Sequence, residues 1–151
     1  MSRALYVLPE CFIDTNLIEY LLNEKVNHQH CCSKVVGQLK TTFNQKFAIG
    51  IIDKDKVELG YIRECEPIAS SSHLCLMKHT AKHQYLITVS PAMDKFILDC
   101  AQDLNIDLTT YSIPSALIDF TKLSKSVTSN RDARFKALFM DIKSHKEIRT
   151  L

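Results

Sequence analysis

Two aspartates follow a run of apolar residues in the stretch FAIGIIDKDK, residues 47–56. Because side chains alternate along an extended strand, Asp53 and Asp55 are predicted to point to one side, with Lys54 and Lys56 on the other. Two carboxylates held close together repel each other unless a cation lies between them, and oxygen ligands suit Mg²⁺ or Mn²⁺. The spacing therefore predicts a divalent metal site, although a D-x-D pair is also common in the polar turns that end strands.

A second group of acidic residues follows the first apolar run, in the stretch VLPECFID. Glu10 comes directly after this run, and Asp14 follows four residues later at the start of a predicted helix. Ligand sites of open α/β sheets form at the carboxyl ends of the strands. If the two strands are parallel neighbours, Glu10, Asp53 and Asp55 converge there and supply enough carboxylate for one or two divalent ions.

The elements that must position these acids follow from the hydrophobic periodicity of the chain. Strands are predicted at residues 4–8, 47–52, 73–79 and 84–90, and helices at 14–23, 31–44 and from 91 onward. The segment from about residue 114 is predicted to be helical, with a polar break at 124–130. At 151 residues, the chain is predicted to be a single α/β domain with a central, mostly parallel sheet flanked by helices.

The first two strands and the intervening helix, which ends in EYLL, resemble the TOPRIM domain of topoisomerases, primases and OLD-type nucleases. The resemblance covers about residues 5–56, and Cys11 stands where that family usually has glycine. It implies a Rossmann-like fold in which Glu10 moves a proton while Asp53 and Asp55 hold Mg²⁺ or Mn²⁺ against a phosphodiester.

The stretch SPAMDKF, residues 90–96, is similar to the acid-bearing helix start of smaller, stand-alone TOPRIM-related proteins. This similarity implies that Asp94 joins the metal site. The function implied by the resemblance is nuclease-type phosphodiester chemistry on DNA or RNA.

Two other interpretations remain open. The stretch FIDTNLIEYLL also resembles the opening of PIN-type ribonucleases, in which Asp14 would be the metal ligand and Phe12 and Ile13 would belong to the first strand. Alternatively, the chain is a non-catalytic α/β binding or assembly module, which would need no divalent ion and would tolerate Asp53→Asn and Asp55→Asn.

Basic residues are concentrated at the C-terminal end of the sequence. Residues 121–151 contain eight Lys and Arg but only three Asp and Glu. Such a segment is a candidate contact for a phosphate backbone, and the same prediction extends to the lysines of the D-x-D stretch. The predicted nucleic-acid contacts are Lys54, Lys56, Lys122, Lys125, Arg131 and Arg134.

Other patterns are interpreted as structural. The spacing of HQHCC, residues 28–32, fits no common zinc motif, and the six scattered cysteines are interpreted as free thiols. His73, His79 and His83 are interpreted as solvated loop side chains. The sequence has no P-loop, so any ATPase would be a separate partner. Without a signal-peptide pattern or a long apolar run, we expect a cytoplasmic protein that is not in the membrane.

Overall fold

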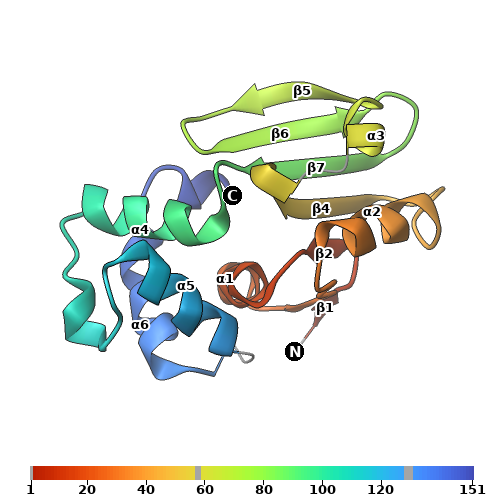
Figure 1. Cartoon of the computed structure of the whole chain (residues 1–151). Coiled ribbons are helices and arrows are strands. Elements are labelled where there is room, and N and C mark those ends of the chain that lie inside the picture. Colours follow the sequence, from red (N-terminus) through yellow and green to blue (C-terminus); the bar gives the residue numbers. More distant parts are fainter. Residues whose placement is uncertain (1, 57–58, 128–130) are drawn as a thin grey trace.

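A five-stranded mixed sheet forms the centre of the computed structural model, which describes residues 2–56, 59–127 and 131–151 (Figure 1). The strands are β2 (Val7–Pro9), β4 (Ala48–Asp53), β5 (Cys65–Ser70), β6 (Leu74–His79) and β7 (Gln84–Val89), in the order β2-β4-β7-β6-β5. β2, β4 and β7 are parallel, and β6 pairs antiparallel with both β7 and β5. The predicted α/β class with a sheet flanked by helices is therefore confirmed.

The first predicted strand, residues 4–8, is divided between two sheets. β1 (Arg3–Ala4) pairs in parallel with β3 (Lys25–Val26), and β2 begins after a two-residue turn. The prediction merged the two strands because the intervening Leu5 and Tyr6 are apolar, although both are exposed. Strand β5 was not predicted, since it contains Pro67 and most of its residues are exposed at the edge of the sheet.

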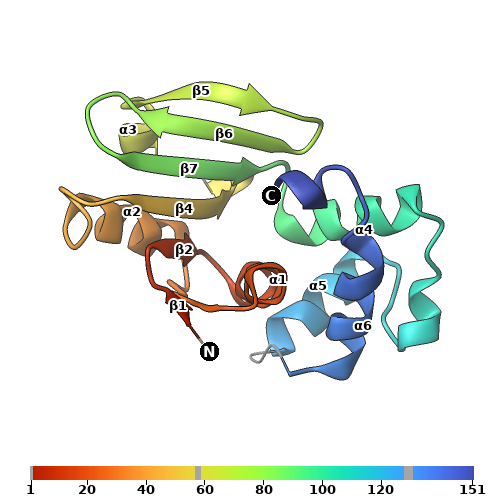
Figure 2. The same ribbon diagram turned by 180° about the vertical axis from the view of Figure 1, so that it is seen from behind.

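Helices cover both faces of the sheet (Figures 1 and 2). They are α1 (Phe12–Leu22), α2 (Cys32–Lys40), α3 (Leu59–Ile62), α4 (Met93–Asp103), α5 (Leu117–Ser126) and α6 (Ala133–Ile142), with 3₁₀ turns η1 (Lys54–Lys56), η2 (Leu108–Tyr111) and η3 (Ile148–Thr150). Helix α2 packs on the face formed by Leu8, Ala48, Ile52 and Leu86. The opposite face joins a larger core with α1, α4, α5 and α6, which stand together beside the carboxyl ends of β4 and β7.

Gly50 in the centre of β4 allows α2 to approach the sheet closely. A Cβ atom at this position would lie 2.7 Å from both Leu86 Cδ2 and Val35 Cγ1. Both neighbours are fully buried, so neither has free space into which it could move. The absence of a side chain at Gly50 therefore fixes the distance between α2 and the sheet.

Several predicted boundaries differ from the structure. Helix α1 begins at Phe12, so Phe12 and Ile13 are helical and do not extend the first strand as the PIN resemblance implied. Its N-cap is Cys11, so the helix begins two residues before the predicted start at residue 14. Helix α5 ends at Ser126, and residues 128–130 of the predicted polar break lie outside the described part. No helix in the part of the chain that the structure describes is long and apolar enough to cross a membrane.

Candidate functional site

Four acidic residues lie next to the carboxyl ends of the three parallel strands. The register of β2 against β4 pairs Pro9 with Ile51, and the next amide, Glu10 N, donates to Ile51 O over 3.1 Å. This register brings Glu10 beside Asp53, the last residue of β4. Asp14 lies in the first turn of α1, which follows β2, and Asp94 lies in the first turn of α4, which follows β7.

Glu10 and Asp53 are buried and bind backbone amides. Asp53 N donates to Glu10 Oε2 over 3.0 Å, and Met93 N donates to Asp53 Oδ1 over 2.9 Å. Glu10 is 2% exposed and Asp53 is 5% exposed. These two bonds link the ends of β2 and β4 to the start of α4, so both side chains have a structural function whatever else they do.

Asp14 is the least satisfied member of the group. Its Oδ2 atom accepts a 3.3 Å hydrogen bond from Cys11 N, whereas its Oδ1 atom is buried and has no hydrogen-bond partner in the described part of the chain. Burial raises the pKa of Asp14 well above its ordinary value, and the negative charge of Asp53 raises it further. An ionised Asp14 therefore carries a large desolvation penalty, which its hydrogen bonds with Cys11 offset only in part.

Asp94 faces a cavity of about 130 Å³ that also reaches Asp53. Ser124 Oγ donates to Asp94 Oδ1 over 2.8 Å, which ties the start of α4 to α5. The cavity is lined by Cys11, Phe12, Ile13, His28, His30, Asp53, Asp94, Ser124 and Lys125. It combines two carboxylates, two imidazoles, a hydroxyl group and an ammonium group, a mixture that could bind a polar ligand.

Asp55 does not join this group, contrary to the prediction for the D-x-D pair. The extended chain ends at Asp53, and η1 begins at the next residue, so the alternation of side chains stops before Asp55. Asp53 is consequently buried, while Asp55 is exposed and does not line the cavity. The prediction assumed that the extended strand continues through residues 54–56, but the sequence there contains only charged residues and no apolar residue that would favour a buried strand.

The donor set has suitable chemistry for a hard divalent cation but is not arranged as a finished metal site. Carboxylate oxygens suit Mg²⁺ and Mn²⁺, and the unpartnered Asp14 Oδ1 is a ligand atom not used elsewhere. However, no three His, Cys, Asp or Glu side chains among residues 2–56, 59–127 and 131–151 are grouped closely enough to hold a metal ion. Any ion would require these carboxylates to draw closer together.

Of the predicted nucleic-acid contacts, Lys125 lies at the cavity itself. Lys54 is exposed just beyond Asp53, while the side chain of Lys56 lies outside the described part. The others are on the surface of the C-terminal helical segment: Lys122 lies 3.7 Å from Asp119, Arg134 lies 2.8 Å from Asp132, and Arg131 is exposed.

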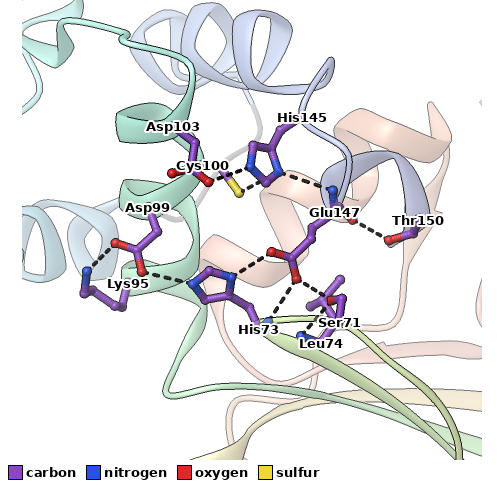
Figure 3. Close-up of polar contacts among 10 residues, drawn as sticks. All are labelled: Ser71, His73, Leu74, Lys95, Asp99, Cys100, Asp103, His145, Glu147 and Thr150. Carbon is purple, nitrogen blue, oxygen red and sulfur yellow. Dashed lines mark hydrogen bonds and ion pairs between the residues drawn. The ribbon is translucent and has the colours of Figure 1, made fainter.

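A second polar cluster, not predicted from the sequence, joins the C-terminal turn to the sheet and α4 (Figure 3). Glu147 accepts hydrogen bonds from Ser71 Oγ and from His73 N, the latter over 2.9 Å. The His73 ring bridges Glu147 and Asp99, with Nδ1 2.8 Å from Glu147 Oε1 and Nε2 3.0 Å from Asp99 Oδ2. His73 and the buried His79 are therefore not solvated loop side chains, whereas His83 is exposed as interpreted.

The same cluster contains a Cys–His–Asp arrangement that resembles catalytic sets of these residues in composition only. His145 Nδ1 lies 3.4 Å from Cys100 Sγ, and His145 Nε2 lies 3.0 Å from Asp103 Oδ2. Cys100 is fully buried, and burial raises the pKa of its thiol to about 12. His145 Nδ1 already accepts a hydrogen bond from Glu147 N over 3.2 Å. A protonated thiol without access to solvent cannot act as a nucleophile, so this set is structural.

Comparison of the chain with protein-family models, curated proteins and solved structures finds no match.

Proposed function

We propose that this protein carries out divalent-metal-dependent phosphodiester chemistry of the nuclease type, on DNA or RNA, at the cavity between β4, α1, α4 and α5. The observation that carries this proposal is the burial of Glu10, Asp14 and Asp53 at one edge of the sheet, with Asp14 Oδ1 unpartnered in the described part. The TOPRIM resemblance of residues 5–56 suggests the same chemistry.

Electrostatics provide the physical reason for a cation. Three carboxylates buried at one edge cannot all remain ionised without a large free-energy cost, so either a proton or a cation must compensate their charge. In the absence of metal, the raised pKa of Asp14 means that this side chain takes up a proton more readily than an ordinary aspartate. A divalent cation would compensate the charge instead and would lower the proton affinity of Asp14 at the same time.

Asp14 and Asp53 would hold such an ion, with Asp94 as a third ligand. The ion would stabilise the negative charge that develops on the phosphoryl oxygens and on the leaving oxygen. Asp94 would have to turn from Ser124, whose hydroxyl group binds it now, and this rearrangement would complete the ligand group. Glu10 is a positioning residue in this scheme because it holds the backbone amide of Asp53.

The ammonium group of Lys125 is placed to bind the substrate phosphate. It lies on α5 at the edge of the cavity and is exposed to solvent. Lys54, which is exposed one residue beyond Asp53, offers a second contact for the phosphate backbone of the same nucleic-acid strand. Such contacts do not distinguish one base from another, so the proposed activity has no sequence preference from this source.

A non-catalytic binding or assembly module is the second candidate, and a specific observation favours it. Glu10, Asp14 and Asp53 each accept a hydrogen bond from a backbone amide, which is a sufficient structural reason for their presence. On this interpretation, the acids hold the turns that follow β2 and β4 and need no metal. A PIN-like ribonuclease would also use Asp14, but its implied extension of the first strand through Ile13 disagrees with the helix observed there.

Cleavage of end-labelled single-stranded DNA and RNA in Mn²⁺ or Mg²⁺ tests the proposal. We expect the wild-type chain and Asp55→Asn to cleave, and Asp53→Asn to lose activity by about 10²-fold or more, because Asp53 lines the cavity and Asp55 does not. Asp55→Asn is the matched control, since the same chemical change is made two residues away on an exposed side chain. Equal activity of all three proteins, or no cleavage by the wild type, would reject the proposal.

A further inference from the structure

Two histidines line the cavity from the loop that follows β3. The loop lies along β2, where Asn27 N donates to Val7 O and Gln29 N donates to Pro9 O, each over 3.0 Å. These bonds carry His28 and His30 to the carboxyl end of β2, where both side chains reach the cavity. The HQHCC stretch therefore places its two imidazoles beside the acidic group.

The hydrogen bonds of His28 determine which of its nitrogens carries the proton. Thr15 Oγ1 donates its only proton to Cys11 O over 2.8 Å. The same hydroxyl oxygen lies 2.7 Å from His28 Nδ1, so it must accept there, and His28 Nδ1 must be the protonated nitrogen. In neutral His28, Nε2 is then an acceptor.

The hydrogen bond between the two rings also fixes the tautomer of His30. His28 Nε2 lies 3.0 Å from His30 Nδ1, so His30 donates its Nδ1 proton to His28. The Nε2 atom of neutral His30 consequently carries a lone pair, and none of the hydrogen bonds among the described residues involves this atom. The two rings form an ordered chain that leaves one proton-accepting nitrogen at its outer end.

Packing and backbone conformation hold this pair in place. The ring of Phe12 stacks on His28 at a centroid distance of 4.3 Å and an interplanar angle of 14°. Burial lowers the pKa of His28, and the neighbouring His30 lowers it further, so both favour the neutral form of this ring. His30 has a backbone φ of 73°, a left-handed conformation that is uncommon outside glycine and that is often retained at functional sites.

We infer that His30 is the group that accepts the proton of the attacking water in this cavity, and that His28 is a positioning residue that fixes the His30 ring. This inference rests on the proposed function and adds the acid–base group to it. Water loses a proton to His30 Nε2, its oxygen bonds to phosphorus, and the bond from phosphorus to the leaving oxygen breaks. The leaving oxygen takes up a proton from solvent, and the exposed His30 imidazolium returns its proton to solvent.

The charges around the pair come from four elements. The groups that face the cavity or act on the two rings are Cys11, Glu19, Asp53, Asp94 and Lys125. The carboxylates give the cavity a negative charge, and Lys125 adds one positive charge. Cys11 contributes no charge at neutral pH, because burial and the charge of Asp14 raise the pKa of its thiol.

Nitrogen-15 NMR of the histidine rings tests the arrangement without any metal or substrate. At alkaline pH, we expect both rings to be protonated at Nδ1 in the wild type. Thr15→Val and His28→Ala should each return His30 to the Nε2-protonated form that free imidazole side chains favour in water. The exposed His83 is the internal control and should not change. An Nε2-protonated His30 in the wild type, or one unaffected by both variants, would overturn the inference.

The kinetic test uses His30→Asn, because asparagine tolerates the positive φ at this position. We expect kcat for Mn²⁺-supported cleavage to fall by about 10²-fold or more, with loss of the acidic limb of the pH profile and unchanged Mn²⁺ affinity. His83→Gln should leave kcat, the pH profile and the Mn²⁺ affinity unchanged. Cleavage by His30→Asn at the wild-type rate would refute the inference. A wild type that neither binds Mn²⁺ nor cleaves would instead refute the proposed function, and the NMR spectra would still decide the arrangement of the histidines.

Discussion

Glu147→Gln should destabilise the protein in a pH-dependent way. The Glu147 carboxylate is 3% exposed and accepts hydrogen bonds from Ser71 and from the backbone and ring of His73. A glutamine amide cannot accept at both ends, so one of these donors would face an NH₂ group. The substitution therefore removes both the negative charge and part of the hydrogen bonding that attaches the C-terminal turn to the sheet.

The magnitude follows from the pKa of Glu147. Burial alone would raise this pKa, but the hydrogen bonds from Ser71 and His73 outweigh burial and lower the pKa from 4.5 to about 2. One unit of pKa corresponds to about 1.4 kcal/mol, so the ionised group contributes at most about 3.5 kcal/mol to the free energy of unfolding. Because the folded pKa is depressed, this contribution is present above pH 4.5 and is lost as the pH falls towards 2.

Urea unfolding at pH 7 and pH 3 measures this effect. We expect Glu147→Gln to lower the free energy of unfolding by about 2–3 kcal/mol at pH 7, and the charge-dependent part to shrink to about 1 kcal/mol at pH 3. Glu66→Gln, on the exposed surface of β5, is the control and should change the free energy by less than about 0.5 kcal/mol at either pH. A deficit of Glu147→Gln that is equal at both pH values would refute the reasoning.

Three further substitutions or reagents test other parts of the structure. Gly50→Ala should lower the free energy of unfolding by about 1–3 kcal/mol in urea titrations, because the added methyl group would lie 2.7 Å from two buried side chains; an unchanged value would contradict the close packing of α2. Asp14→Asn should stabilise the metal-free protein by about 1 kcal/mol at pH 7, since Asp14 is ionised in the unfolded wild type and must take up a proton or bury its charge on folding. That gain should disappear as the pH falls below the ordinary pKa of 3.8, where Asp14 is protonated in the unfolded as well as the folded wild type; a gain that persists there would contradict this origin. A thiol reagent followed by mass spectrometry should modify Cys31, which is accessible and whose pKa is lowered by a hydrogen bond from Ser33, well before the buried Cys100; equal rates would show that α4 opens readily.

The main elements and the acidic edge could be predicted because strong local patterns specify them. The apolar run that ends at Asp53 is long enough to require a buried strand, and the acids after β2, β4 and β7 all follow such runs. The prediction for Asp55 failed because residues 54–56 begin a 3₁₀ turn, and charged residues alone do not distinguish such a turn from continued strand. The alternation of side chains along a strand cannot show at which residue the backbone leaves the extended conformation.

The polar cluster around Glu147 depends on contacts distant in sequence. Glu147 meets His73 across 74 residues, and Cys100 meets His145 across 45 residues, so no local spacing signals either contact. The histidine pair at residues 28 and 30 is visible in the sequence, but its local spacing fits no common zinc motif and does not reveal the tautomers of the two rings. Its orientation depends on Thr15 and Phe12 of α1, which the sequence could not place against the loop after β3.

Calorimetric titration of Mn²⁺ into chelator-treated protein at pH 7 tests the central claim most directly, that the buried acidic edge holds a divalent cation. We expect the wild type and Asp55→Asn to bind Mn²⁺ equally, and Asp53→Asn and Asp14→Asn to lose binding while their circular dichroism spectra show that they remain folded. Binding should also release protons, because Asp14 must ionise to become a ligand. No binding by the wild type, or equal binding by Asp53→Asn, would contradict the account and leave the non-catalytic module as the better description.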